Sequence, residues 1–179
     1  AGGERQIATD IDLQHADRAC AAWRRTTFAT RAATMKAAGK LLRRHTKTYA
    51  RMMAQEMGKP LAQGGSETEK CAWVCDYYAQ HAERFLSPEV IATDAAKSYV
   101  TFEPLGIVLA VMPWNFPFWQ VFRAAVPALM AGNAVVLKHA SNVPGCALAI
   151  EELFRQAGFP KGLFRALLVS TDQVAGLIE

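Results

Sequence analysis

Hydrophobic and polar residues follow two different patterns along the chain. Residues 12–86 are rich in Ala, Arg, Lys, Glu, Met and Gln and poor in β-branched residues, a composition and spacing typical of helices. Residues 105–169 instead alternate short apolar runs with helical stretches. The pattern predicts a helical first part followed by an α/β part.

Three helices are expected in the first part, and several residues mark their ends. Asp12 could cap the first helix, and the second is expected to break near Gly39 or His45. Ser66 and Glu69 have the spacing of a capping box at the start of the third. The expected helices span residues 12–25, 28–57 and 66–85.

The second part predicts a strand-helix-strand unit that continues into another helix and strand. Its continuous apolar runs suit strands covered on both faces, as in a parallel sheet with a Rossmann-like order. The expected strands are 107–112, 134–137 and 163–169, and the expected helices are 117–130 and 145–156. Residues 97–103 alternate and predict a short strand outside this sheet, and Ser170 is expected to cap a further helix.

Composition and charge narrow the class of protein. With 179 residues, of which 51% are apolar, the chain can form a globular domain with a substantial core. Lys and Arg exceed Asp and Glu by only 20 to 16 and form no basic stripe, so nucleic-acid binding is not expected. The start lacks a signal-peptide core and no apolar run reaches the ~18 residues that cross a bilayer. We therefore expect no membrane association and a cytoplasmic location.

Four cysteines are present, at Cys20, Cys71, Cys75 and Cys146, without paired metal spacing. Cys71 and Cys75 lie one helical turn apart, which could make a thiol pair or half of a metal site. Because no further Cys or His cluster lies near them in the sequence, we expect reduced thiols packed in the core and no metal.

Two polar residues follow the predicted carboxyl ends of neighbouring strands, the edge at which open α/β sheets bind ligands. Asn115 stands in a turn bracketed by Pro113 and Pro117, and Lys138 ends the second strand. Asn115 could donate its amide N–H to a developing oxyanion, or could form an Asx turn or helix cap. Lys138 could bond to ribose or phosphate oxygens, or could be a solvated charge.

Several motifs together resemble the amino-terminal half of the aldehyde dehydrogenase superfamily, and they cover nearly the whole chain in order. The Lys-His-Ala-Ser stretch and Arg123 make the chain most similar to the succinate-semialdehyde dehydrogenases of that superfamily. The motifs are MGKP at 57–60, YVTFEPLG at 99–106, PWNFP at 113–117, PALMAGNAVVLKHAS at 127–141 and AGFPKGLF at 157–164.

The resemblance implies oxidation of an aldehyde through a cysteine thiohemiacetal, hydride transfer to nicotinamide and hydrolysis of a thioester. Asn115 aligns with the asparagine of the oxyanion hole, and Lys138 aligns with the lysine that holds the adenosine ribose. The strand end that packs along the cofactor aligns with Val111, Met112, Pro113 and Trp114.

Phe116 and Arg123 align with the entry of the substrate. Seven residues separate them, so on a continuous helix they would share a face. Succinate-semialdehyde dehydrogenases similar to this chain carry an Arg at this offset, which would bind the distal carboxylate of a small aldehyde. The alternative is an internal salt bridge or an Arg that extends to solvent along the surface.

Ser141 departs from a common family pattern, in which a Glu at this position accepts bonds from the adenosine ribose hydroxyls. A carboxylate would repel a 2′-phosphate and a hydroxyl would not, so the cofactor is expected to be NAD or NADP.

The resemblance also divides the chain. Residues 1–96 would be the helical part of the cofactor domain, 97–104 a strand of the oligomerisation or bridging region, and 105–179 the first half of the NAD(P)-binding α/β domain. The nucleophilic Cys and general-base Glu are expected after residue 179, so this portion alone is expected to be inactive. The whole protein is expected to be a homodimer or homotetramer. Two other interpretations stay open: a non-catalytic interaction module on the same scaffold, and an acylating relative.

Overall fold

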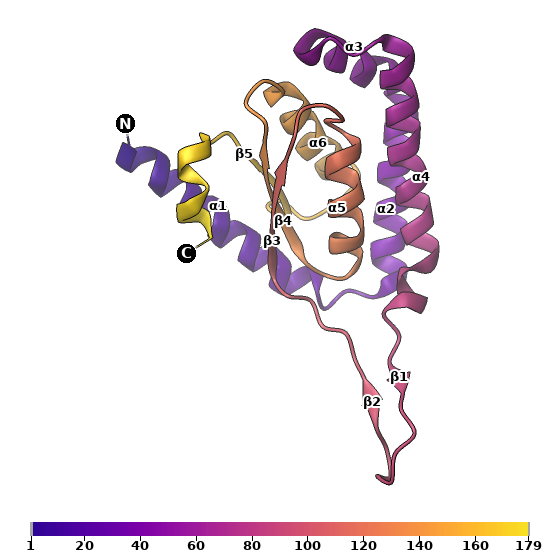
Figure 1. Cartoon of the computed structure of the whole chain (residues 1–179). Coiled ribbons are helices and arrows are strands. Elements are labelled where there is room, and N and C mark those ends of the chain that lie inside the picture. The colour runs from indigo at the N-terminus through magenta and orange to yellow at the C-terminus, as the bar shows by residue number, and fades with distance from the viewer. Residues whose placement is uncertain (1, 179) are drawn as a thin grey trace.

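The computed structural model describes residues 2–178 and shows an α/β architecture (Figure 1). Two short 3-10 turns, Thr171–Gln173 and Ala175–Leu177, follow the last strand. The main elements are α1 (Gly2–Trp23), α2 (Phe28–Arg44), α3 (Thr46–Met57), α4 (Leu61–Phe85), β1 (Glu89–Val90), β2 (Tyr99–Val100), β3 (Ile107–Met112), α5 (Trp119–Met130), β4 (Ala134–His139), α6 (Pro144–Gln156) and β5 (Phe164–Leu167).

The predicted parallel sheet is confirmed, with the strand order β3-β4-β5. Helix α1 packs against one face of this sheet, and α5 and α6 pack against the other (Figure 1). Helices α2, α3 and α4 form a further layer outside α5 and α6. All six residues of β4 are buried, which agrees with a strand covered on both faces.

A two-stranded hairpin projects away from this body (Figure 1). Strand β1 pairs with β2 in antiparallel orientation, with Glu89 opposite Val100. The strand predicted for residues 97–103 is therefore present but shorter, since only Tyr99–Val100 is paired.

Two of the predicted helix starts are wrong. Helix α1 already runs from Gly2, so Asp12 lies inside the helix and accepts a hydrogen bond from Arg165 at 3.0 Å instead of capping. Helix α4 begins at Leu61, so Ser66 is also internal, and its hydroxyl donates to the carbonyl of Ala62 at 3.1 Å. Glu69, the other half of the predicted capping box, pairs with Arg43.

The end of α3 and the start of α4 explain this difference. Gly58 ends α3 in the left-handed conformation, at φ 74°, and Pro60 directly precedes α4. Gly64 is not a helix breaker, because a Cβ on it would lie 2.9 Å from Cα of Ala50. The glycine allows α3 and α4 to approach closely.

The remaining boundaries agree with the sequence patterns to within a few residues. The expected break in the second helix occurs at His45, between α2 and α3. Ser170 caps the segment that follows, as predicted, through a capping box with Gln173, although this segment is a short 3-10 turn. Within the described residues, every helix is too short or too polar to cross a membrane.

Candidate functional site

The carboxyl ends of β3 and β4 lie side by side and define the candidate site. The parallel register places Val111 opposite Lys138 and Met112 opposite His139. The turn that contains Asn115 follows β3 directly, so the two predicted site elements meet at the same edge of the sheet. This is the edge at which open α/β sheets bind ligands.

The turn between β3 and α5 exposes the side chain of Asn115, as predicted. Among the described residues, no hydrogen bond engages the side-chain amide of Asn115. The Asx-turn alternative is therefore not observed, and the amide is available to a ligand. The backbone of the same residue is held, because its carbonyl accepts a hydrogen bond from Nζ of Lys59 at 2.9 Å.

Lys59 belongs to a buried ion pair. Its ammonium contacts Oε2 of Glu67, and both side chains are almost fully buried, at 5% and 2% exposure. The same ammonium lies 4.0 Å from the centre of the Phe116 ring. Oε1 of Glu67 accepts hydrogen bonds from the backbone N–H groups of Phe118 and Trp119, both at 2.9 Å. Glu67 thereby caps the start of α5, where a carboxylate also interacts favourably with the helix dipole.

A third side chain, that of His139 at the end of β4, also binds the turn. Nδ1 of His139 accepts from the backbone N–H of Ala140 at 2.9 Å, so Nε2 carries the hydrogen and donates to the carbonyl of Pro117 at 2.9 Å. Burial lowers the pKa of His139, which keeps the ring neutral and in this tautomer at neutral pH.

These three supporting residues were missed by sequence reasoning. Lys59 was noticed only as part of the MGKP motif, and His139 only as the neighbour of Lys138. Glu67 carried no signal of its own. The one signal in the sequence was the position of Lys59 between Gly58 and Pro60, because these neighbours restrict the backbone of the lysine.

Lys138 is buried, so the interpretation of a solvated charge is wrong. Its ammonium lies 3.4 Å from Oγ1 of Thr171, in the segment after β5. Ser141 is exposed in the loop that follows β4. Val111 and Trp114 are about half exposed, at 53% and 50%, and Met112 and Pro113 lie between them. The result is an accessible, largely apolar strand end with a hydroxyl and a fixed ammonium nearby.

A pocket of about 420 Å³ opens beside the turn, between α4 and the start of α5. Phe116 and Trp119 line it, and Nζ of Lys70 lies 4.0 Å from the centre of the Trp119 ring. The remaining lining residues are Ala62, Gln63, Ser66 and Glu67.

Phe116 lines this pocket but Arg123 does not, so the two residues expected together at the substrate entry are not both found there. Phe116 precedes α5, so the argument that it shares a helical face with Arg123 does not apply. The residue that does so is Trp119, which lies one turn before Arg123 and lines the pocket. Arg123 is exposed, and among the described residues it forms no ion pair, so the internal salt bridge is not observed.

The four cysteines are buried as free thiols, which agrees with the expected core packing. Burial raises the pKa of Cys71, Cys75 and Cys146, so these thiols stay protonated and unreactive. In the part of the chain that the structure describes, no cluster of three or more His, Cys, Asp and Glu side chains could hold a metal ion.

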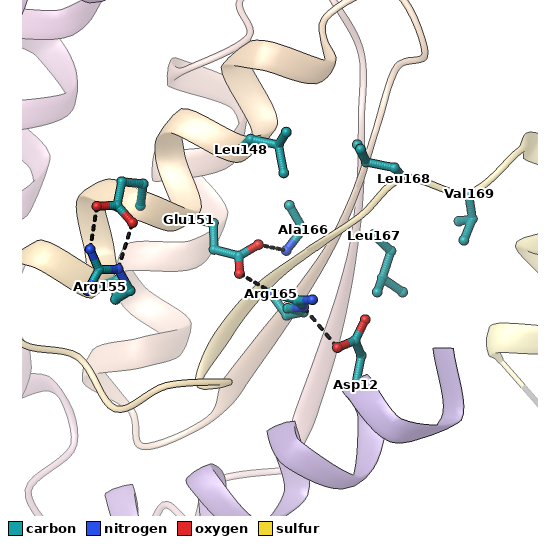
Figure 2. A pocket seen from close by; sticks show the side chains of 10 residues that line it. Asp12, Leu148, Glu151, Arg155, Arg165, Ala166, Leu167, Leu168 and Val169 are labelled. Atoms are coloured by element: carbon teal, nitrogen blue, oxygen red, sulfur yellow. Dashed lines mark hydrogen bonds and ion pairs between the residues drawn. The ribbon is translucent and has the colours of Figure 1, made fainter. Parts of the chain in front are cut away.

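A second pocket, of about 440 Å³, lies between α6, β5 and α1 (Figure 2). Arg165 donates to Asp12 at 3.0 Å and to Glu151 at 2.6 Å, and Glu151 also accepts from the backbone N–H of Ala166 at 2.9 Å. Figure 2 shows these charged groups directed toward one another rather than into the open space. They close the edge of the sheet at β5 and are not a candidate active site.

Comparison with known proteins agrees with this arrangement. The model of the aldehyde dehydrogenase family matches residues 4–178. A probable NADP(+)-type succinate-semialdehyde dehydrogenase of Synechocystis sp. is 50% identical over 164 residues, covering 92% of this chain and 36% of that protein. An NAD(P)+-type succinate semialdehyde dehydrogenase of Escherichia coli is 42% identical over 174 residues, covering 96% and 38%.

Solved structures give the same result. A succinic semialdehyde dehydrogenase from Streptococcus pyogenes, determined in complex with NADP+, matches with a TM-score of 0.91 and 36% identity over 95% of this chain and 38% of that one. The chain thus spans somewhat more than a third of the length of these relatives, consistent with their amino-terminal portion. The fold, the exposed asparagine turn and these matches lead to one conclusion: the chain belongs to the aldehyde dehydrogenase family.

Proposed function

We propose that the chain is the amino-terminal portion of an NAD(P)-dependent aldehyde dehydrogenase that oxidises succinate semialdehyde to succinate. The observation that carries the proposal is the free amide of Asn115, exposed at the carboxyl edge of the sheet in a turn held by buried groups. The relatives named as succinate-semialdehyde dehydrogenases support the substrate class.

Asn115 would stabilise the reaction's tetrahedral intermediate. Its amide N–H would donate to the oxygen that becomes negatively charged when a nucleophile adds to the aldehyde carbon. Removing one such donor costs about 2.7–4 kcal/mol of transition-state stabilisation in enzymes where this has been measured. The nucleophile itself would come from outside this chain, because all four cysteines of this chain are buried in its core. The chain alone should therefore not oxidise aldehydes.

The same edge fits a nicotinamide dinucleotide. The half-exposed strand end from Val111 to Trp114 offers an apolar surface, and Lys138 presents a fixed ammonium that could donate to ribose hydroxyls. When bound, the cofactor supplies the acceptor for the hydride that leaves the aldehyde carbon. Ser141 adds no negative charge that would repel a 2′-phosphate, so both NAD and NADP are proposed as cofactors.

The pocket beside Phe116 could hold the rest of the substrate. The rings of Phe116 and Trp119 offer apolar contacts for a short aliphatic chain. Lys70 adds a cation above the Trp119 ring, and Arg123 adds a second one turn farther along α5. The two cations, one in the pocket and one on the next turn of α5, are suited to a carboxylate at the far end of the substrate.

The projecting hairpin supports a proposal about assembly. Val90 is 81% exposed and Tyr99 52% exposed, although both are apolar in character. Such strands are available for pairing with another chain. We therefore propose that residues 97–104 belong to an oligomerisation region, which follows a helical part, 1–96, and precedes a cofactor-binding part, 105–179. The whole protein would assemble as a homodimer or homotetramer.

The test is an assay of the protein expressed from the complete reading frame that contains this chain. With NADP or NAD, we expect turnover of succinate semialdehyde with kcat/KM about 100-fold above that of butanal, because hydrogen bonds to a charged group contribute about 1.5–3 kcal/mol. The 179-residue chain is the matched control and should form no reduced cofactor. Equal activity toward both aldehydes would contradict the substrate, and a requirement for coenzyme A or phosphate would favour an acylating enzyme.

A further inference from the structure

The buried Lys59–Glu67 pair contacts the Asn115 turn from two directions. Lys59 lies in the connection between α3 and α4, and Glu67 lies two helical turns farther along α4. Lys59 donates to the carbonyl of Asn115, and Glu67 accepts from the N–H groups of Phe118 and Trp119. The pair therefore fixes the backbone on both sides of Pro117, while leaving the amide side chain of Asn115 free.

Stability alone gives little reason for a pair at this place. Removing two charges from water costs about as much as their attraction returns, and an apolar pair of similar volume is often as stable. An apolar pair, however, could not donate to one carbonyl and accept from two N–H groups. The contacts that only the charged pair can make are those to the turn.

We propose that Lys59 and Glu67 are positioning residues that orient the amide of Asn115 toward the oxyanion. This inference rests on the proposed function, in which Asn115 donates to that oxygen. Because the direction of a side chain follows its backbone, releasing the carbonyl of Asn115 would displace the donor. A displacement of about 1 Å in a reacting geometry can cost about 100-fold in rate. The loss should appear in kcat and leave KM for the aldehyde within about threefold.

A double-mutant cycle tests the inference in the protein from the complete reading frame. We expect Lys59→Met to lower kcat by about 100-fold and Asn115→Ala to lower it by about 100- to 1,000-fold. If Lys59 acts through Asn115, the double variant should be no slower than Asn115→Ala by more than about threefold. The matched control is Glu151→Gln, since Glu151 accepts from Arg165 and from the N–H group of Ala166 at β5, and β4 separates β5 from the strand that leads into the turn. It should keep kcat within about twofold.

The outcomes separate the inference from the proposed function. Unchanged kcat in Asn115→Ala would remove the role of Asn115 itself. A large loss in Asn115→Ala combined with no loss in Lys59→Met, or with losses that multiply in the double variant, would overturn the positioning role. If Lys59→Met does not fold, Glu67→Gln replaces it in the same cycle, because a glutamine oxygen can still accept from Phe118 and Trp119. Full coupling to Asn115 is expected there too, and multiplying losses would again refute the inference.

Discussion

The buried pair beneath the turn makes a thermodynamic prediction that the 179-residue chain can test by itself. The changes are Lys59→Met, Glu67→Gln and the two together. Each single change leaves one buried charge without its counter-ion, whereas the double change leaves two neutral side chains of similar size. The two neutral side chains together should therefore destabilise the fold less than either change alone.

The magnitudes follow from the contacts that remain. Losing one member of a buried pair costs about 3–5 kcal/mol. In each single variant the remaining charged residue keeps its other hydrogen bonds: Lys59 still donates to the carbonyl of Asn115, and Glu67 still accepts from two backbone N–H groups. We therefore expect each single variant to lower the free energy of unfolding by about 3 kcal/mol. The double variant loses one hydrogen bond to a half-exposed turn, about 1 kcal/mol. The interaction energy between the two sites is then about 5 kcal/mol.

Urea unfolding followed by circular dichroism measures these differences. With an m-value of about 2 kcal/mol/M, a loss of 3 kcal/mol lowers the midpoint by about 1.5 M, and the double variant should lie within about 0.5 M of the parent. Two results would refute the reasoning. Single variants with an unchanged midpoint would mean that water reaches the pair, and a double variant that loses the sum of both would mean that the charges do not interact.

Three further predictions concern other parts of the chain. Burial lowers the pKa of His139 below its ordinary value of 6.5, so the unfolded chain binds this proton more readily than the folded chain. The free energy of unfolding should therefore fall as the pH falls below 6.5. In a His139→Gln variant, the free energy of unfolding should change less with pH between 6.5 and about 5. Gly64→Ala should destabilise the fold by about 1–3 kcal/mol, because the new Cβ would lie 2.9 Å from Cα of Ala50. Gly65→Ala on the same helix meets nothing closer than 3.7 Å and should stabilise the fold by up to about 1 kcal/mol. Thermal unfolding of both variants would distinguish steric conflict from helix propensity. The four buried thiols should not react with Ellman's reagent at pH 8 until urea unfolds the chain, and rapid labelling of the folded chain would contradict their burial.

The fold was predictable where local chemistry determines it. Apolar runs gave the three strands of the sheet, and Gly58 in the left-handed conformation marks a true helix end. Prediction failed where a residue serves a distant contact. The third helix is expected from the sequence to begin at Ser66, but α4 begins at Leu61, and the close approach of Ala50 gives Gly64 a packing role inside it. The capping box assigned to Ser66 was an error that followed from this one.

The candidate site divides in the same way. Asn115 and Lys138 could be found because each directly follows an apolar strand, and parallel strands bring their carboxyl ends together. The residues that hold the turn could not be found, since Lys59 and Glu67 contact it from the α3–α4 connection and from α4, more than fifty positions earlier in the sequence. Their spacing of eight residues, with a helix start between them, has no periodicity that would indicate a pair.

The difference between residues that can be predicted from their sequence neighbours and residues that are placed by tertiary contacts also applies to substrate selection. An exposed group can be recognised from its neighbours, because the turn chemistry around it is local, but its orientation depends on tertiary contacts. Arg123 illustrates the limit: it lies on the predicted helix, yet the aromatic residue that shares its face is Trp119 and not Phe116, since α5 begins only at Trp119. Lys70, which contacts that ring from α4, is therefore placed as well as Arg123 to meet a carboxylate. If Lys70→Met and Arg123→Leu each lower the preference for succinate semialdehyde over butanal, both cations bind the carboxylate. If only Lys70→Met lowers this preference, Lys70 alone recognises the carboxylate. The recognising cation would then be one that the tertiary structure, and not its position in the sequence, brings to the site.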